Sequence, residues 1–263
     1  MGSLIRFTVR GRWLGQPKTT KNVPPVTAGY LKANFPLAVR FLNMQNRAAG
    51  AAGVAFVGLL PDTMWQAGQY DDAPTPTLTD DTADAQGGVT NAFALETTTN
   101  ADGFMVGADV KFGAISLDIT TASVGAGQVH TVEYWNGTAW IVIAATGMLI
   151  DGPRTAGQTW AAGEQILLFD PPSDWVKGSG AVVGGNQSRY WIRHRVTTAA
   201  TTAGLAARLY VGTVFASQDA LAANATLERR YDLSLPMIPD YYVAVGGVFA
   251  TEDENNLVEL VSG

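Results

Sequence analysis

The chain has 263 residues, a formal net charge of −6 and no cysteine, which excludes disulfides, zinc–thiolate sites and thiol nucleophiles. It contains no run of about 18 uncharged apolar residues, so we expect no membrane-spanning helix. Arginines interrupt the N-terminus before an apolar run of the signal-peptide kind forms. Only 15% of the residues are charged, and this Thr- and Val-rich composition favours β-structure packed against neighbours.

Charge is divided unevenly along the chain. Residues 1–50 contain eight Lys or Arg and no acid, whereas residues 51–110 contain nine acids and no base. Removing the +8 of the leading segment from the total of −6 leaves −14 for residues 51–263. A basic extension on an acidic body indicates a partner of opposite charge: nucleic acid, an acidic protein surface, or this protein's own body or a neighbouring copy.

The spacing of the leading cations favours a protein partner. Nucleic-acid-binding tails cluster Lys and Arg, because counterion release rewards many simultaneous phosphate contacts, but here single cations stand among apolar residues. We therefore expect residues 1–60 to be an extended arm that lies on a protein surface and is ordered by its companions. The expected contact residues are Arg6, Arg10, Arg12, Trp13, Lys18, Lys21, Tyr30, Phe35, Arg40, Phe41 and Arg47.

Prolines limit helix formation in the arm. Pro17, Pro24 and Pro25 exclude a regular helix there. Residues 29–48 are ambiguous, since Pro36 prevents one continuous helix but residues 37–47 could form a short one. Residues 61–89 are expected to be an acidic, turn-rich linker. Its Asp80, Asp81 and Asp84 could offer oxygens to calcium, although a solvated acidic loop is the favoured interpretation.

Residues 90–215 alternate at period two and predict short antiparallel strands. In "AISLDIT", Ile115, Leu117 and Ile119 share one face, which predicts a half-buried strand. In "SRYWIRHRVT", one face carries arginines and Trp191. This face could bind an anion, but we expect it to pair with acids on a neighbouring strand or subunit. That face comprises Arg189, Trp191, Arg193 and Arg195, and the other comprises Tyr190, Ile192, His194 and Val196.

The stretch "TVEYWNGTAWIVIAATG" predicts a hairpin. Asn136-Gly137 favours a two-residue type I′ turn, which would place Trp135 opposite Thr138 and Glu133 opposite Trp140. The two tryptophans would then lie on opposite faces and could not form one flat platform. We expect a structural hairpin, with a ligand platform as the alternative.

Several motifs together resemble a β-sandwich module of tailed-bacteriophage virion proteins. They are Tyr134-Trp135-Asn136-Gly137-Thr138-Ala139-Trp140, then Asp151-Gly152, then Phe169-x-Pro171-Pro172-x-x-Trp175, then Tyr190-Trp191-Ile192-Arg193. The pattern covers about 70 residues, and it departs from the module at Pro153, where Thr commonly follows the Asp-Gly. Such modules occur in head decoration proteins, head fibres and tail or baseplate proteins. The resemblance therefore implies a structural role, and trimeric assembly by analogy, but it does not cover either terminus.

The C-terminal segment, residues 216–263, is expected to add β-structure that packs with the N-terminal region as a smaller unit. The predicted fold is thus mainly β. It has an antiparallel, jelly-roll-like β-sandwich body over residues 90–215, an extended N-terminal arm, and a smaller unit formed by both termini.

Catalytic chemistry is not indicated. His130 and His194 are the only histidines; they lie on different predicted strands without a nucleophile elbow or metal-ligand spacing, so we expect packed rings. No cofactor, metal or catalytic residue is assigned. The expected function is that of a capsid decoration or cement protein in the virion, assembled in the bacterial cytoplasm, with the major capsid protein or other virion proteins as partners. A tail or baseplate component is the first alternative. A carbohydrate-binding module using Trp135, Trp140, Trp160 or Trp175 is another, and a nucleic-acid-binding arm is the least favoured.

Overall fold

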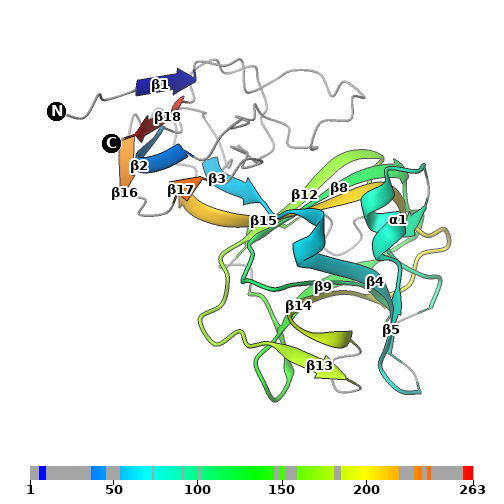
Figure 1. Cartoon of the computed structure of the whole chain (residues 1–263). Helices are drawn as coiled ribbons and strands as arrows, with labels where there is room; N and C mark the ends of the chain where they lie inside the picture. Colours follow the sequence, from blue (N-terminus) through cyan, green and yellow to red (C-terminus); the bar gives the residue numbers. More distant parts are fainter. Residues whose placement is uncertain are drawn as a thin grey trace. The chain divides into compact units, whose positions relative to one another are not determined.

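The computed structural model (Figure 1) describes residues 6–9, 37–45, 54–72, 74–90, 92–99, 102–144, 148–151, 159–180, 185–218, 228–232, 236–237 and 257–262. This part of the chain is mainly β, as predicted, with antiparallel sheets, one short α-helix and one 3-10 turn. Eight of the predicted arm contacts lie outside the described residues: Arg10, Arg12, Trp13, Lys18, Lys21, Tyr30, Phe35 and Arg47.

The chain divides into two compact units, one made of Met1–Leu60 and Gly212–Gly263 and the other of Pro61–Val211. Strands from both ends of the chain pair in the first unit, in the order β1-β18-β2-β16, with β17 also paired to β2. These strands are β1 (Arg6–Val9), β2 (Leu37–Gln45), β16 (Glu228–Asp232), β17 (Pro236–Met237) and β18 (Leu257–Ser262). In addition, β3 (Val54–Leu59) pairs with the second half of β15 (Leu205–Gln218).

These pairings change the expectation for the leading segment. The ambiguous residues 37–47 contain a strand, β2, and not a short helix. β2 is hydrogen-bonded to β18 on one side and to β16 on the other, which satisfies backbone groups along both of its edges. Of the expected arm, β1, β2 and β3 are therefore held by strands of the same chain. Arg6, Arg40 and Phe41 lie within β1 and β2.

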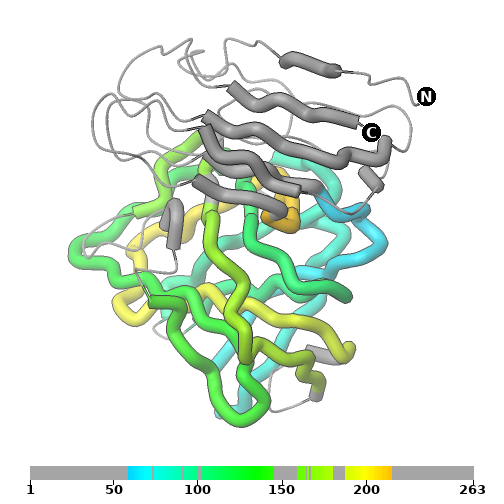
Figure 2. The backbone as a smooth tube through the Cα atoms, turned by 90° about the vertical axis from the view of Figure 1, so that its left-hand side faces the viewer, coloured from blue at the N-terminus to red at the C-terminus, as the bar shows by residue number. Residues whose placement is uncertain are grey.

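The second unit contains a sheet in the order β10-β9-β14-β7-β4-β5, with β13 paired to β14. Figure 2 shows the backbone of this unit coloured in sequence order from cyan through green to yellow. The strands are β4 (Trp65–Asp71), β5 (Thr77–Asp80), β7 (Gly103–Ala108), β9 (Val129–Trp135), β10 (Trp140–Val142), β13 (Gly178–Gly180) and β14 (Gly185–Thr198).

A further sheet runs in the order β11-β12-β8-β15-β3, with β6 paired to β15. Its remaining strands are β6 (Phe93–Ala94), β8 (Ala114–Thr121), β11 (Met148–Asp151) and β12 (Gly163–Phe169). As predicted, Ile115, Leu117 and Ile119 are all buried on β8. Phe93 of β6 meets Phe104 of β7 edge-to-face, with ring centroids 6.0 Å apart, so aromatic rings join this sheet to the one containing β7.

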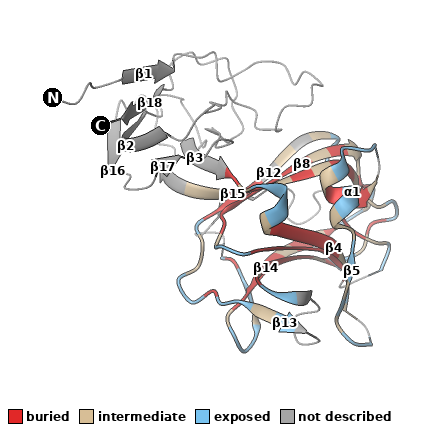
Figure 3. Cartoon of the chain, viewed as in Figure 1, coloured by how far each residue is buried: buried red, intermediate tan, exposed pale blue. Residues whose placement is uncertain are grey.

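The segment expected to be a linker, residues 61–89, contributes regular structure. It forms the 3-10 helix η1 (Asp62–Met64), β4, β5 and the helix α1 (Thr82–Gly87). β4 lies between β7 and β5 in its sheet and is buried along most of its length (Figure 3). Residues on both faces of β4 are buried, so the segment lacks the exposed–buried alternation that marks a half-buried strand.

Candidate functional site

The hairpin between β9 and β10 differs from its predicted register. Trp140 pairs directly with Trp135, so the connection has four residues, 136–139, and not two. Asn136 closes it: its side-chain Oδ1 accepts hydrogen bonds from the backbone N of Thr138 at 3.0 Å and of Ala139 at 2.9 Å. Gly137 has φ +101°, a backbone conformation that favours glycine. The prediction that the two tryptophans lie on opposite faces is therefore wrong.

The tryptophan pair is nevertheless no flat platform. The two rings meet edge-to-face, with centroids 5.8 Å apart and an interplanar angle of 64°. Trp135 is only 7% exposed and packs with Tyr70, Met105 and Trp191, while Trp140 packs against this cluster from outside. Opposed aromatic rings in this geometry stabilise a strand pair. Trp135 is thus part of the core, and Trp140 lies at its edge.

The motif residues from distant segments converge on this hairpin. Trp175 is buried, and its Nε1 donates to the carbonyl oxygen of Trp191 at 3.1 Å. The next residue, Val176, donates its backbone N–H to the carbonyl oxygen of Trp135, also at 3.1 Å. The Tyr134 hydroxyl donates to Asp174 at 2.9 Å. Three of the motifs that are separated in sequence therefore form one packed cluster.

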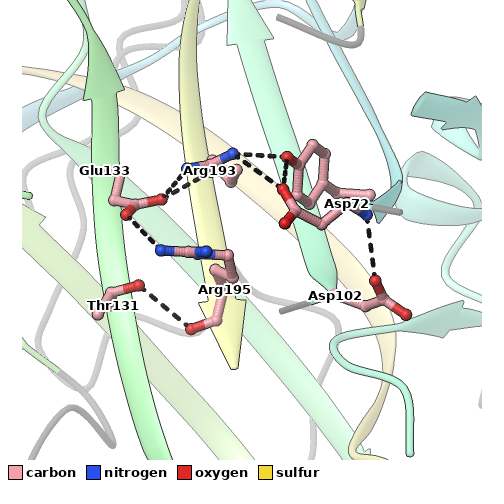
Figure 4. A network of polar contacts seen from close by, with 7 residues as sticks. Asp72, Asp102, Thr131, Glu133, Arg193 and Arg195 are labelled. Atoms are coloured by element: carbon pink, nitrogen blue, oxygen red, sulfur yellow. Dashed lines mark hydrogen bonds and ion pairs between the residues drawn. The ribbon is translucent and has the colours of Figure 1, made fainter. Parts of the chain in front are cut away.

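A network of charged side chains lies on the same face of the sheet (Figure 4). Glu133 of β9 accepts hydrogen bonds from Arg193 of β14 at 2.6 Å and from Arg195 at 3.1 Å. Arg193 also contacts Asp72 at 3.6 Å and donates to the Tyr70 hydroxyl at 2.5 Å. The side chains of Arg193 and Glu133 are only 7% and 4% exposed, so each buried charge has a partner of opposite sign.

Aromatic rings complete the surroundings of Arg193. Its guanidinium carbon lies 4.5 Å from the centroid of the Trp140 ring and 4.9 Å from that of Tyr70, both within the range of cation–π attraction. Burial and the hydrogen bond to Asp72 raise the pKa of Tyr70 to about 12. Tyr70 therefore stays protonated at neutral pH and donates to Asp72. Two arginines, Arg193 and Arg195, and two carboxylates, Asp72 and Glu133, pair with one another in this network.

The expected role of the arginine-rich face of β14 is confirmed. Arg193 and Arg195 pair with Glu133 on the neighbouring strand, and Arg189 pairs with Asp109, which follows β7, at 3.2 Å. These cations are paired with acids inside the unit.

Asp80, which precedes α1, also has internal partners. Asp80 accepts hydrogen bonds from Gln66 at 2.6 Å and from the Thr82 hydroxyl at 2.6 Å. Burial, followed by the charges of Asp84 and Asp80, raises the pKa of Asp81. Within the described ranges no group of three His, Asp or Glu side chains is placed to hold a metal ion. The helix in those ranges is too short to cross a membrane.

The two histidines are core residues, as expected. His130 of β9 is 2% exposed and His194 of β14 is fully buried, and their ring centroids lie 5.1 Å apart. Glu96, only 1% exposed, approaches His130 with 3.9 Å between Oε2 and Nδ1. Burial raises the pKa of Glu96, while hydrogen bonds from Gly204, Ser123 and Gln128 oppose this effect.

Sequence reasoning did not single out the acids that organise these clusters. Glu133, Asp72 and Glu96 are spread over three segments, and only the strand pairing brings them to their partners. A signal was present for Glu133: its alternation with Trp135 on β9 places it on the hairpin's packed face. No comparable pattern marks Glu96, which lies in a loop after β6.

No family model matches the chain, and neither a curated protein nor a solved structure matches it.

Proposed function

We propose that the protein is a non-enzymatic virion structural protein of a tailed bacteriophage, namely a capsid decoration or cement protein. The observation that carries the proposal is the convergence of the virion-module motifs. Trp135, Trp175 and Trp191 pack or hydrogen-bond with one another, although they belong to segments far apart in sequence. The packing of the residues that carry the resemblance into one cluster supports a β-sandwich body used as a building module.

The distribution of charge supports attachment through the leading segment. In the described part of the body, all four arginines, Arg189, Arg193, Arg195 and Arg208, have acidic partners. The leading 50 residues carry +8 without any acid. Their cations would form charge-assisted hydrogen bonds with an acidic surface of shell subunits or of a neighbouring copy, and their aromatic residues would supply apolar anchors.

The strand pairings shorten the stretch of sequence to which we assign attachment. β1 and β2 are engaged by β18 and β16 of the same chain, whereas Arg10, Arg12, Lys18, Lys21 and Lys32 fall between β1 and β2 in the sequence. We assign shell contact to this stretch. A protein that binds only the assembled state shifts the assembly equilibrium toward it by mass action, which is how a cement protein strengthens a shell.

The location is tested by fractionating virions of the phage that encodes the chain. Heads and tails are separated on a density gradient, and the chain is quantified in each fraction by mass spectrometry. We expect it in heads, at a copy number proportional to that of the major capsid protein. Recovery with tails would support a tail or baseplate component, and absence from both fractions would overturn the virion assignment.

The attachment segment is tested with a charge-neutralised variant. Arg10, Arg12, Lys18 and Lys21 are replaced together by Gln, and binding to heads stripped of the chain is measured by co-sedimentation at several salt concentrations. We expect weaker binding and a shallower salt dependence than for wild type. The control is Lys177→Gln, which removes an exposed cation of the body that lies 5.5 Å from the Tyr190 ring centroid. Unchanged binding of the fourfold variant would contradict this mode of attachment.

A carbohydrate-binding role is less well supported. Of the four tryptophans that could have formed a sugar platform, Trp135, Trp160 and Trp175 are buried. Trp140 is half-buried and its ring lies over Arg193. A platform needs exposed rings, so these side chains favour the structural role.

A further inference from the structure

The turn of the β9–β10 hairpin contains a side-chain amide that can react with its own backbone. Asn136-Gly137 is the only Asn-Gly pair in the sequence. In such a pair the backbone N of the glycine can attack the side-chain Cγ of the asparagine, because glycine has no Cβ to hinder the approach or to restrict φ and ψ. Asn136 is half-buried and Gly137 is exposed, so the turn is in contact with water.

The reaction is a deamidation that passes through a cyclic imide. A bond forms between the Gly137 N and the Asn136 Cγ, and the bond from Cγ to Nδ2 breaks. Nδ2 takes up the proton that the Gly137 N loses and leaves as ammonia. One water molecule from the solvent then adds to either of the two imide carbonyl carbons, and the ring opens to aspartate or to isoaspartate. No oxidant, reductant or cofactor enters the balance.

Hydrogen bonds restrict the side chain that must move for this reaction. The Asn136 Oδ1 accepts from the backbone N of Thr138 at 3.0 Å, from the Thr138 hydroxyl at 3.0 Å and from the backbone N of Ala139 at 2.9 Å. The imide ring closes when Cγ meets the Gly137 N face-on, which requires rotation about the Cα–Cβ and Cα–C bonds of Asn136. Each hydrogen bond given up during this rotation slows ring closure by about two- to tenfold.

The backbone at Asn136 is restricted as well. Its N–H donates to the carbonyl oxygen of Ala139 at 3.1 Å, and the carbonyl oxygen of the preceding residue, Trp135, accepts from the backbone N of Val176 at 3.1 Å. Trp135 is in turn packed in a buried cluster. Rotation about the Cα–C bond of Asn136 is therefore opposed by hydrogen bonds within the turn and beside it.

We propose that Asn136 is a deamidation site whose reaction rate is set by the hairpin, so that the folded turn protects the amide and unfolding exposes it to conversion. Donors to Oδ1 also stabilise the negative charge that this oxygen gains when Cγ is attacked, which acts in the opposite direction. Three hydrogen bonds on Oδ1, together with a fixed backbone, favour protection as the larger effect. The proposal does not rest on the proposed virion role.

The two products should affect the hairpin differently. Aspartate keeps a carboxylate oxygen where Oδ1 was, and this oxygen accepts the same hydrogen bonds from Thr138 and Ala139. Isoaspartate carries the main chain through Cβ and Cγ, which adds one atom to the connection between β9 and β10. Because Trp140 pairs directly with Trp135 and lies over Arg193, the longer connection should displace the Trp140 ring from both.

The test compares deamidation of the full chain in its folded and unfolded states. Wild type is incubated in mildly alkaline buffer, with and without enough guanidinium chloride to unfold it, and peptide mapping by mass spectrometry follows the conversion of Asn136 to aspartate and isoaspartate. We expect conversion in the folded chain to be at least about tenfold slower than in the unfolded chain. Equal rates, or a faster reaction in the folded chain, would overturn the proposal.

A variant measures the contribution of one donor. Thr138→Val removes the hydroxyl that donates to Oδ1 and keeps the backbone donor of the same residue, so we expect about two- to tenfold faster conversion in the folded chain and no change in the unfolded chain. The matched control is Thr197→Val, which removes an exposed hydroxyl that donates to the carbonyl oxygen of Val129 at 3.1 Å, away from the turn. The control should react as wild type does. No acceleration in Thr138→Val, or equal acceleration in both variants, would contradict protection by these hydrogen bonds.

Discussion

Trp135 and Trp140 face each other directly across the β9–β10 hairpin, with ring centroids 5.8 Å apart. The arrangement depends on Asn136, whose side chain closes a four-residue connection by accepting hydrogen bonds from Thr138 and Ala139. A two-residue turn would have shifted the register and separated the rings. The local choice of turn thus determines which side chains complete the core and which cover Arg193.

The two tryptophans should contribute unequally to stability. Trp135→Ala removes a ring that is 7% exposed, and we expect it to lower the free energy of unfolding by about 3–5 kcal/mol. Trp140→Ala removes a half-buried ring and its contact with Arg193, for which we expect about 1–2 kcal/mol. Urea unfolding followed by circular dichroism measures both values. Equal losses would contradict the assignment of Trp135 to the core.

The buried carboxylate of Glu133 should contribute far more to the free energy of unfolding than an exposed carboxylate does. Glu133→Gln leaves Arg193 and Arg195 without their shared counter-charge, and we expect a loss of about 3–5 kcal/mol in the free energy of unfolding. The control is Asp62→Asn, which breaks the partly exposed pair with Arg208 at 3.0 Å. That change should cost about 1 kcal/mol or less. Comparable losses in the two variants would show that the Glu133 network is not buried.

Tyr70 should resist ionisation to strongly alkaline pH. Its pKa is raised to about 12, chiefly by burial and by its hydrogen bond to Asp72, whereas an exposed tyrosine ionises near pH 10. A raised pKa in the folded state means that stability is full below pH 10 and declines as the pH rises toward 12. Tyrosinate absorbance of wild type and Tyr70→Phe measures this. Loss of a component titrating near pH 10 in the variant would contradict the buried position of the hydroxyl.

The sequence was most informative where a pattern is local. Alternation on β8 and β14 predicted which side chains share a face, because strand periodicity depends only on neighbouring residues. The sequence also predicted that the arginines of β14 pair with acidic residues on a neighbouring strand or subunit. Which acids they are could not be predicted, since Asp72 and Glu133 reach Arg193 only through the pairing of β14 with β9 and the placement of β4 beside β7.

The expectations that differ from the structure also have specific physical causes. The predicted hairpin register is wrong because the Asn136 side chain accepts the hydrogen bonds that would otherwise close a two-residue backbone turn. An asparagine side chain can do this because its carbonyl oxygen reaches the backbone N–H two residues further on. β4 lies in the segment expected to be a linker, because a strand buried on both faces shows no alternation in its sequence. The sequence leaves segment 37–47 ambiguous because its pairing partners, β16 and β18, lie more than about 180 residues away in sequence.

Close packing of β7 against β14 leads to a final prediction, at Gly107. A Cβ atom placed on Gly107 would lie 2.4 Å from the Trp191 ring, which is fully buried and cannot move aside without disturbing Trp135 and Tyr70. We therefore expect Gly107→Ala to lower the free energy of unfolding by about 1–3 kcal/mol through overpacking. The matched control is Gly87→Ala at the end of α1, where the nearest heavy atom is 4.0 Å from the added methyl group. That change should stay within about 0.5 kcal/mol of wild type. Both values come from urea unfolding, and a Gly107→Ala protein as stable as the control would mean that β7 and Trp191 are less tightly packed than these distances indicate.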